Sequence, residues 1–283
     1  MVLENRDLSM MLETAIVAAR LAGQRAMEEI SFVKASVKNS TELVTQADAR
    51  CQQIIIDRIK ETYPDHGFIA EEGERSTAIL AVPARAGSPC YKQPPRGAED
   101  IWWLIDPIDG TNNFAHKMLL FTVSIAAMYK GEPVAGVIFD PATESMFTAV
   151  QGGEAQLNGR RITVSEEKMD QFSSVGLDSH FIDEIPRWAC EIMKRTRFRV
   201  IGSAALHLAY IAKGGLIADI TQATKLWDIA AGVLIAENAG AVATDWQGGK
   251  IFPVDLNSYD SGKFKILTAN KKVHAELLKL LSD

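Results

Sequence analysis

The sequence IWWLIDPIDGTNNF, at residues 101–114, decides how the rest of the chain is interpreted. Its first five residues are apolar and mostly β-branched or aromatic, which predicts a buried strand. Pro107 and Gly110 then turn the chain, because Pro fixes its own φ and Gly adopts conformations closed to other residues. Asp106 and Asp109 are therefore expected at the end of a strand, on a stiff and sharply bent segment.

This turn has two interpretations. Carboxylate oxygens and a backbone carbonyl, here that of Ile108, are the hard ligands that Mg²⁺ prefers. Asp, Pro, Gly and Thr are also ordinary turn and capping residues, so a polar turn with Thr111 as the N-cap of a short helix is the plain alternative. The turn alone does not decide between them.

Two further acidic segments favour the metal. Residues 68–73, FIAEEG, place Glu71 and Glu72 after a short apolar run, and residues 226–232, LWDIAAG, place Asp228 at the start of an apolar helix. A carboxylate buried beside Trp227 is costly without a partner. A bound cation explains all three segments at once.

The three segments together resemble the motifs of the inositol monophosphatase family, within the sugar-phosphatase superfamily: the Glu-Glu pair, the Asp-Pro-Ile-Asp-Gly-Thr turn and the late Trp-Asp segment. They occur in the expected order, and the resemblance runs from about residue 40 to residue 245. It implies a fold of mixed α+β and α/β character, a layered αβαβα sandwich with the active site between its halves. It also implies a Mg²⁺-dependent phosphatase that is inhibited by Li⁺ and forms a homodimer.

The resemblance also implies a ligand set for two or three Mg²⁺ ions. Glu71, Asp106 and the carbonyl of Ile108 would hold the first ion. Asp106, Asp109 and Asp228 would hold the second, so that Asp106 bridges the two. In such a site the metals activate a water and stabilise the departing oxygen.

Other residues would then act around the metals. Thr111 and Glu71 would orient the attacking water, while the amides of Gly110 and Thr111 would bind phosphate oxygens. Asp48 would approach the site from the second shell, although a carboxylate at a helix N-terminus is an equally good interpretation. Glu72 would support Glu71 or face solvent.

Substrate contacts are expected at two places besides Asp109. The turn formed by Gly202, Ser203 and Ala204 joins a strand to a helix, whose free N–H groups could bind an anion or a polar substrate group. A plain Ser N-cap is the alternative. Lys225 could meet a second phosphate or a carboxylate, or else be solvated.

The identity of the substrate stays open at this point. Inositol-specific relatives carry a Glu shortly before the late Trp-Asp pair, whereas residues 221–226 here contain no acid. Inositol-1-phosphate or a related sugar or polyol phosphate is expected first. A 3′(2′),5′-bisphosphate nucleotide and histidinol phosphate are alternatives, and a non-catalytic sensor of phosphate esters is the alternative of another class.

The pattern of the chain predicts two regions. Residues 1–165 should form an N-terminal α+β region that carries the Glu-Glu and Asp-Pro-Ile-Asp-Gly-Thr motifs, and residues 166–283 a C-terminal α/β region with a partly parallel sheet, which supplies Asp228 and the 202–204 turn. Residues 74–100 contain four of the ten prolines and are expected to form a long loop, either a surface insertion or a lid.

Composition limits the partners. The net charge of −6 argues against general binding of nucleic acid, so a small phosphorylated metabolite is expected instead. No signal sequence and no apolar run long enough to span a bilayer is present. Three scattered cysteines do not indicate a disulfide framework. A cytoplasmic protein without a membrane partner is the resulting expectation.

Overall fold

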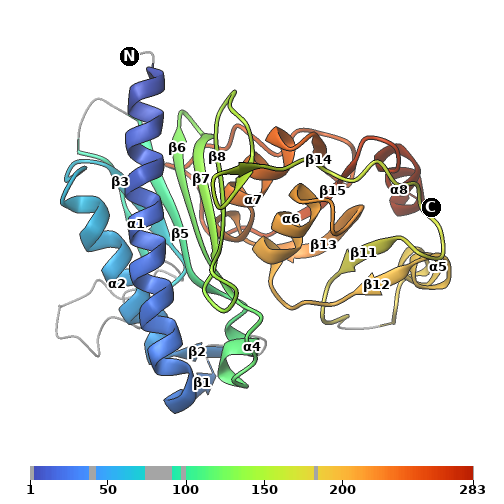
Figure 1. Ribbon diagram of the computed structural model, residues 1–283, viewed down its shortest axis with the longest axis horizontal. Helices are drawn as coiled ribbons and strands as arrows, with labels where there is room; N and C mark the ends of the chain where they lie inside the picture. The colour runs from blue at the N-terminus through green and yellow to red at the C-terminus, as the bar shows by residue number, and fades with distance from the viewer. Residues whose placement is uncertain (1–2, 38–42, 74–90, 97–99, 182–183, 283) are drawn as a thin grey trace.

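The computed structural model describes residues 3–37, 43–73, 91–96, 100–181 and 184–282, and it has five layers (Figure 1). Helices α1 (Asn5–Glu29) and α2 (Gln46–Lys60) cover one face of an eight-stranded sheet. Helices α6 (Ala204–Ala212) and α7 (Leu226–Asn238) lie between that sheet and a five-stranded sheet. The expected layered α+β sandwich is confirmed. None of the helices in the described ranges combines the length and apolar character needed to cross a membrane.

The eight-stranded sheet has the order β10-β9-β8-β7-β6-β5-β3-β4. Its strands are β3 (Gly67–Ala70), β4 (Tyr91–Gln93), β5 (Ile101–Asp109), β6 (Thr122–Tyr129), β7 (Glu132–Asp140), β8 (Ser145–Val150), β9 (Gln156–Leu157) and β10 (Arg160–Arg161). Only β3 and β5 run parallel; the other neighbours are antiparallel.

The interpretation of residues 74–100 as one long loop was wrong at Tyr91–Gln93. This segment is strand β4, which pairs antiparallel with β3 at the edge of the sheet. An edge position suits a short strand followed by prolines, since only one of its sides must form hydrogen bonds. Residues 74–90 and 97–99 lie outside the described residues, so a lid role there is not addressed.

The five-stranded sheet has the order β12-β11-β13-β15-β14. Its strands are β11 (Ser174–Leu177), β12 (Arg197–Arg199), β13 (Ala218–Thr224), β14 (Ala241–Asp245) and β15 (Phe264–Asn270). The first three in this order are parallel and the rest antiparallel, so the partly parallel sheet is confirmed. Helices α5 (Arg187–Arg195) and α8 (His274–Ser282) pack on its outer face.

Short elements complete the described part of the chain, among them a 3₁₀ turn at Ile30–Phe32. Strands β1 (Ala35–Val37) and β2 (Leu43–Thr45) form a separate two-stranded sheet, and α4 (Thr111–Ala115) follows β5 directly. Because α4 begins where β5 ends, the 101–114 segment runs without a connecting loop from the centre of the sheet into a helix.

Strand β5 separates two cores, and its alternation positions the first acid. Ile101, Trp103 and Ile105 pack on the side of α1 and α2, whereas Trp102 and Leu104 pack on the side of α6 and α7. Successive side chains of a strand point to opposite faces. Asp106 follows in the same phase as Trp102 and Leu104, so it faces the layer that contains α7.

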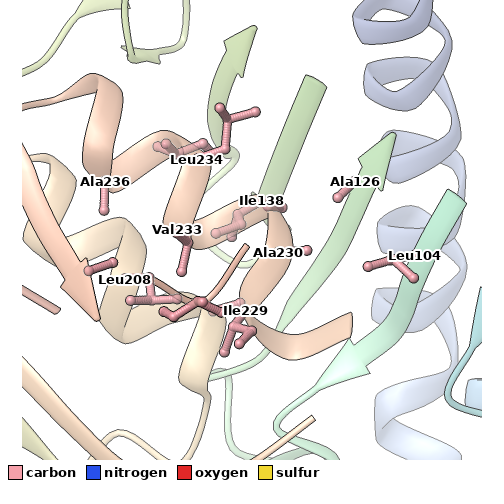
Figure 2. Packing of buried hydrophobic residues seen from close by; sticks show 14 of the residues in the cluster. Leu104, Ala126, Ile138, Leu208, Ile229, Ala230, Val233, Leu234 and Ala236 are labelled. Carbon is pink, nitrogen blue, oxygen red and sulfur yellow. The ribbon is translucent and has the colours of Figure 1, made fainter. Parts of the chain in front are cut away.

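Close packing fixes α7 against the sheet and against α6. Figure 2 shows Ile229, Ala230 and Val233 of α7 among side chains of the sheet and of α6. A Cβ added at Gly136 of β7 would lie 3.1 Å from the backbone of Ala231, and one at Gly232 would lie 2.5 Å from Leu208 of α6. The small residues therefore permit the close approach that holds the first turn of α7 near the end of β5.

The buried core around α6 and α7 includes residues from both large sheets, such as Leu104 of β5 and Ile266 of β15. All strands of the eight-stranded sheet precede residue 165, and all strands of the five-stranded sheet follow it. The division into two regions at that point nevertheless stays a prediction, because the two sheets share this core.

Candidate active site

The parallel pairing of β3 and β5 brings the first two acids together. Ala70 pairs with Ile105, and the N–H of Glu71 donates to the carbonyl of Ile105 at 3.1 Å. Since the carboxyl ends of parallel strands meet at one edge, Glu71 and Asp106 leave the sheet side by side. Asp106 is almost completely buried and Glu71 is half-buried.

The turn after Asp106 is a bulge inside β5. The pairing with β6 shifts between Asp106 and Asp109, and the N–H of Ile108 donates to Oδ1 of Asp106 at 3.0 Å. Gly110 has φ of 103°, and a Cβ there would lie 2.9 Å from the carbonyl of Leu120. Only Gly fits this conformation and this approach, which directs Asp109 toward α6.

Thr111 links the turn to the start of α2. Its hydroxyl donates to the carbonyl of Ile108 at 3.0 Å and lies 3.3 Å from Oδ1 of Asp48. The other oxygen of Asp48 accepts hydrogen bonds from the N–H and the hydroxyl of Thr45, at 2.8 and 2.5 Å. Asp48 thus lies in the first turn of α2, as the plain interpretation expects, and it also contacts Thr111. Its position in the second shell of a metal stays a prediction.

Asp109 is held by the start of α6. Its Oδ2 accepts hydrogen bonds from the hydroxyl of Ser203 at 2.5 Å and from the N–H of Ala205 at 2.7 Å. The Ser203 oxygen also accepts from the N–H of Leu206 and so caps the helix. The anion at this helix terminus is therefore Asp109 itself. The substrate contacts expected from Gly202, Ser203 and Ala204 stay predictions.

Asp228 lies in the first turn of α7, as expected. Its Oδ2 accepts hydrogen bonds from the hydroxyl of Thr224 at 2.9 Å and from the N–H of Lys225 at 2.8 Å. The ammonium group of Lys225 donates to the carbonyl of Ser261. The expected substrate contact of Lys225 stays a prediction, and its head group has a protein partner.

The four carboxylates affect one another strongly. Burial, followed by the negative charges of Glu71, Asp109 and Asp228, raises the pKa of Asp106 well above its usual range. Burial and the charge of Asp228 raise the pKa of Asp109 to about 7. Burial also raises the pKa of Asp228. Such mutual repulsion in a buried site is relieved by a cation.

The chemistry of this donor set fits a hard divalent ion, since carboxylate and carbonyl oxygens are the ligands that Mg²⁺ prefers. Its spacing is not yet that of a closed site: within the described ranges, no three His, Cys, Asp or Glu side chains form a ready-made metal cluster. Glu71, Asp106, Ile108, Asp109 and Asp228 are thus brought to one region, and their role as ligands stays a prediction.

Two features were missed by the sequence interpretation. The side-chain amide of Gln52, on α2, accepts from the N–H of Glu72 at 2.9 Å and donates to its carbonyl at 2.8 Å. This pair fixes the backbone directly after Glu71. Glu72 itself is fully buried, so of its two predicted environments the solvent-facing one was wrong. The only available signal was the polar Gln52 among the apolar positions of a predicted helix.

The second missed feature is a cavity of about 160 Å³ beside Asp228. It lies where β11 and β13 end and where α6 and α7 begin. Its polar lining includes Asp178, Ser203, His207, Thr221, Thr224 and Asp228. No motif pointed to Asp178 or His207, because they come from separate elements that only the five-stranded sheet brings together.

The chain is similar in sequence to known proteins over most of its length. Residues 7–283 match the model of the inositol monophosphatase family. The chain is 34% identical over 248 residues to the Nus factor SuhB of Vibrio cholerae, covering 84% of this chain and 86% of the relative. It is 32% identical over 243 residues to the fructose-1,6-bisphosphatase/inositol-1-monophosphatase of Thermotoga maritima, covering 86% and 83%.

A solved structure agrees with the fold. The extragenic suppressor protein suhB of Bartonella henselae superimposes with a TM-score of 0.80 at 27% identity, over 97% of this chain and 99% of that one.

Proposed function

Because the chain belongs to the inositol monophosphatase family, we propose that it hydrolyses a small phosphate monoester in a Mg²⁺-dependent reaction. One observation carries the proposal. Carboxylates from β3, the β5 bulge and α7 converge in a buried region where they raise each other's pKa. Such an arrangement is unfavourable for a core and suited to bound cations.

The proposed ligands are those that the resemblance implies. Glu71, Asp106 and the Ile108 carbonyl would hold one ion. Asp106, Asp109 and Asp228 would hold a second. The proposal covers two or three ions. When bound, the ions would supply an activated water and charge stabilisation at the departing oxygen. The hydrogen bonds from Ile108, Ser203 and Thr224 orient three of these carboxylates from one side.

Thr111 would orient the attacking water together with Glu71. Its hydroxyl bonds to the Ile108 carbonyl and faces Asp48, so its rotamer is held by two acceptors. The amides of Gly110 and Thr111 would bind phosphate oxygens. Direct transfer of the phosphoryl group to water needs no covalent intermediate with the protein.

We propose inositol-1-phosphate or a related sugar or polyol phosphate as the substrate. The name of the Thermotoga maritima relative supports this class. A 3′(2′),5′-bisphosphate nucleotide and histidinol phosphate are the enzymatic alternatives. We also propose a cytoplasmic homodimer that is inhibited by Li⁺; light scattering of the purified protein tests the dimer.

The name Nus factor, carried by SuhB relatives, favours a second candidate function. It describes a factor rather than an enzyme, so a non-catalytic role that depends on a partner or on binding of a phosphate ester is the alternative of another class. The presence of Thr111 and Glu71 beside the other acids supports catalysis, since a pure binder needs no water-orienting pair.

Phosphate release from a panel of inositol, sugar, nucleotide and histidinol phosphates tests the proposal. We expect release from at least one ester with Mg²⁺, its loss with EDTA and its inhibition by Li⁺. If folded protein that binds Mg²⁺ releases phosphate from none of them, the enzymatic proposal is wrong and the non-catalytic role is favoured.

A further inference from the structure

The cavity beside Asp228 contains a second acid that the proposed chemistry does not use. Asp178 follows β11 directly. It lines the same cavity as Asp228, which lies in the first turn of α7. If phosphate is bound at the carboxylate cluster, as the proposed function requires, the alcohol part of the substrate occupies the remainder of this cavity. Asp178 then faces that alcohol.

The charge of Asp178 is stabilised mainly by hydrogen-bond donors of Gln222 and more weakly by His207. Its Oδ2 accepts from the N–H of Gln222 at 2.7 Å. Burial, opposed in part by this hydrogen bond, raises its pKa to about 6. At pH 7.5 it is therefore ionised, in a half-buried position where further donors are favourable.

The ring of His207, which lines the same cavity, is paired with another acid. Nδ1 of His207 lies 2.8 Å from Oδ1 of Asp219, and the N–H of Ile201 donates to Nε2 at 3.2 Å. An Nε2 that accepts leaves the ring proton on Nδ1, toward Asp219. His207 is thus paired with Asp219. Burial acts to lower the pKa of His207, but the charge of Asp219 raises it, so any positive charge on the ring is opposed by the adjacent Asp219 carboxylate.

Among the described residues that line the cavity there is no Lys or Arg. Lys225, which the sequence suggested for a second phosphate, is close in the chain, but its ammonium group donates to the carbonyl of Ser261. A second anionic group on the alcohol would therefore meet Asp178 and no Lys or Arg side chain from the described lining.

From this arrangement we propose that Asp178 is a specificity-determining residue, which accepts hydrogen bonds from hydroxyl or amino groups of the substrate alcohol and discriminates against alcohols that carry a second phosphate or a carboxylate. The inference rests on the proposed function of the same site. It ranks the polyol and amino-alcohol esters above the bisphosphate nucleotides.

The test compares two esters that differ by one phosphate, inositol 1-phosphate and inositol 1,4-bisphosphate, on three proteins. These are the wild type, Asp178→Asn and the control Glu166→Gln. Glu166 is an exposed acid that pairs with Lys272 away from the cavity. A hydrogen bond to a charged group is worth about tenfold or more in binding. We expect the wild type to prefer the monophosphate in kcat/KM by about tenfold, on this basis.

In Asp178→Asn the preference should fall to about twofold on the same basis. The kcat/KM should decrease for the monophosphate and increase for the bisphosphate. Glu166→Gln should match the wild type. An unchanged ratio in Asp178→Asn, in protein that turns over the monophosphate, would overturn the specificity role while leaving the proposed function intact.

Calorimetry keeps the two claims separate. If the wild type releases phosphate from neither ester, the proposed function is contradicted for these substrates, and titration of both esters in Mg²⁺ still decides the role of Asp178. Tighter binding of the monophosphate that is lost in Asp178→Asn would support it. Equal binding of the two esters by the wild type would overturn it.

Discussion

Acids follow strands at two pairs of parallel strands, two acids at the first pair and one at the second, and the two ends differ in what surrounds these acids. At β3 and β5, Glu71 and Asp106 leave the sheet side by side and repel each other. At β11 and β13, Asp178 follows Leu177, the partner of Ile220, and accepts a hydrogen bond from the N–H of Gln222. Two adjacent carboxylates repel each other and are stabilised by a bound cation. A carboxylate that is held by hydrogen-bond donors is suited to binding hydroxyl groups. The first end would hold metal and the second would recognise the alcohol.

The largest effect is expected for Asp106→Asn, which removes the acid at the centre of the first end. Loss of the bridging carboxylate should lower kcat by roughly a hundredfold or more, as removal of a key electrostatic group does in other enzymes. Without Mg²⁺ the melting temperature should rise, because a buried repulsion is removed. Phosphate release and calorimetry measure both. The exposed acid Asp57 provides the control, and a variant as active as the wild type would refute the assignment.

Ser203→Ala tests the link between the two ends. The Ser203 hydroxyl caps α6 and donates to Asp109, so its loss should cost about 1–2 kcal/mol of unfolding free energy and weaken Mg²⁺ binding. Urea denaturation and Mg²⁺ titration give the two values. Ser203→Thr keeps the hydroxyl and should restore most of each. If Ala and Thr behave alike, the hydroxyl has no such role.

Gln52→Ala tests the support behind Glu71. Both hydrogen bonds to the Glu72 backbone are lost, at a cost of roughly 1–3 kcal/mol for the buried groups left unpaired. Mg²⁺ affinity should fall with stability, because the chain at Glu71 is released. The neighbouring Gln53 is half-buried, and its side-chain amide donates to Asp57 at 2.7 Å on the same helix. Gln53→Ala should change neither quantity.

The smallest effect concerns how His66 and Asp178, one on each side of this comparison, change the free energy of unfolding with pH. On the side of β3 and β5, burial lowers the pKa of His66 to about 4, and its Nδ1 accepts from Trp103. The unfolded chain then binds the proton more tightly, so His66 reduces stability as pH falls from 7 to 5. Asp178, whose folded pKa is raised to about 6, binds the proton more tightly when folded and increases stability over the same interval.

Unfolding free energies at pH 7 and pH 5 check these opposite signs. His66→Gln should lose less stability on acidification than the wild type, and Asp178→Asn should lose more. Shifts of the same sign in both variants would contradict the assignment of the two groups.

The sequence predicted what depends on neighbouring residues. The apolar run 101–105, the turn after Asp106 and the helix that begins near Trp227 are local patterns, and the structure has a strand, a bulge and α7 there. Family motifs then predicted which acids meet, and the fold brings them to one region.

What the sequence did not predict depends on contacts between distant segments. The bond between Asp109 and Ser203 joins residues 94 positions apart, and that between Gln52 and Glu72 joins residues 20 apart. Asp178 belongs to a cavity that exists only once β11, β13, α6 and α7 are assembled. Short strand β4 was missed because its pairing with β3, and not its composition, makes it a strand.

The most direct test of the central claim is X-ray diffraction from crystals soaked in Mn²⁺, whose anomalous signal locates the ion. We predict peaks within coordination distance of Asp106, shared with Glu71 on one side and with Asp109 and Asp228 on the other, and their loss in Asp106→Asn. Well-ordered crystals with these four carboxylates clearly resolved, and with no peak beside Asp106 at millimolar Mn²⁺, would contradict the account.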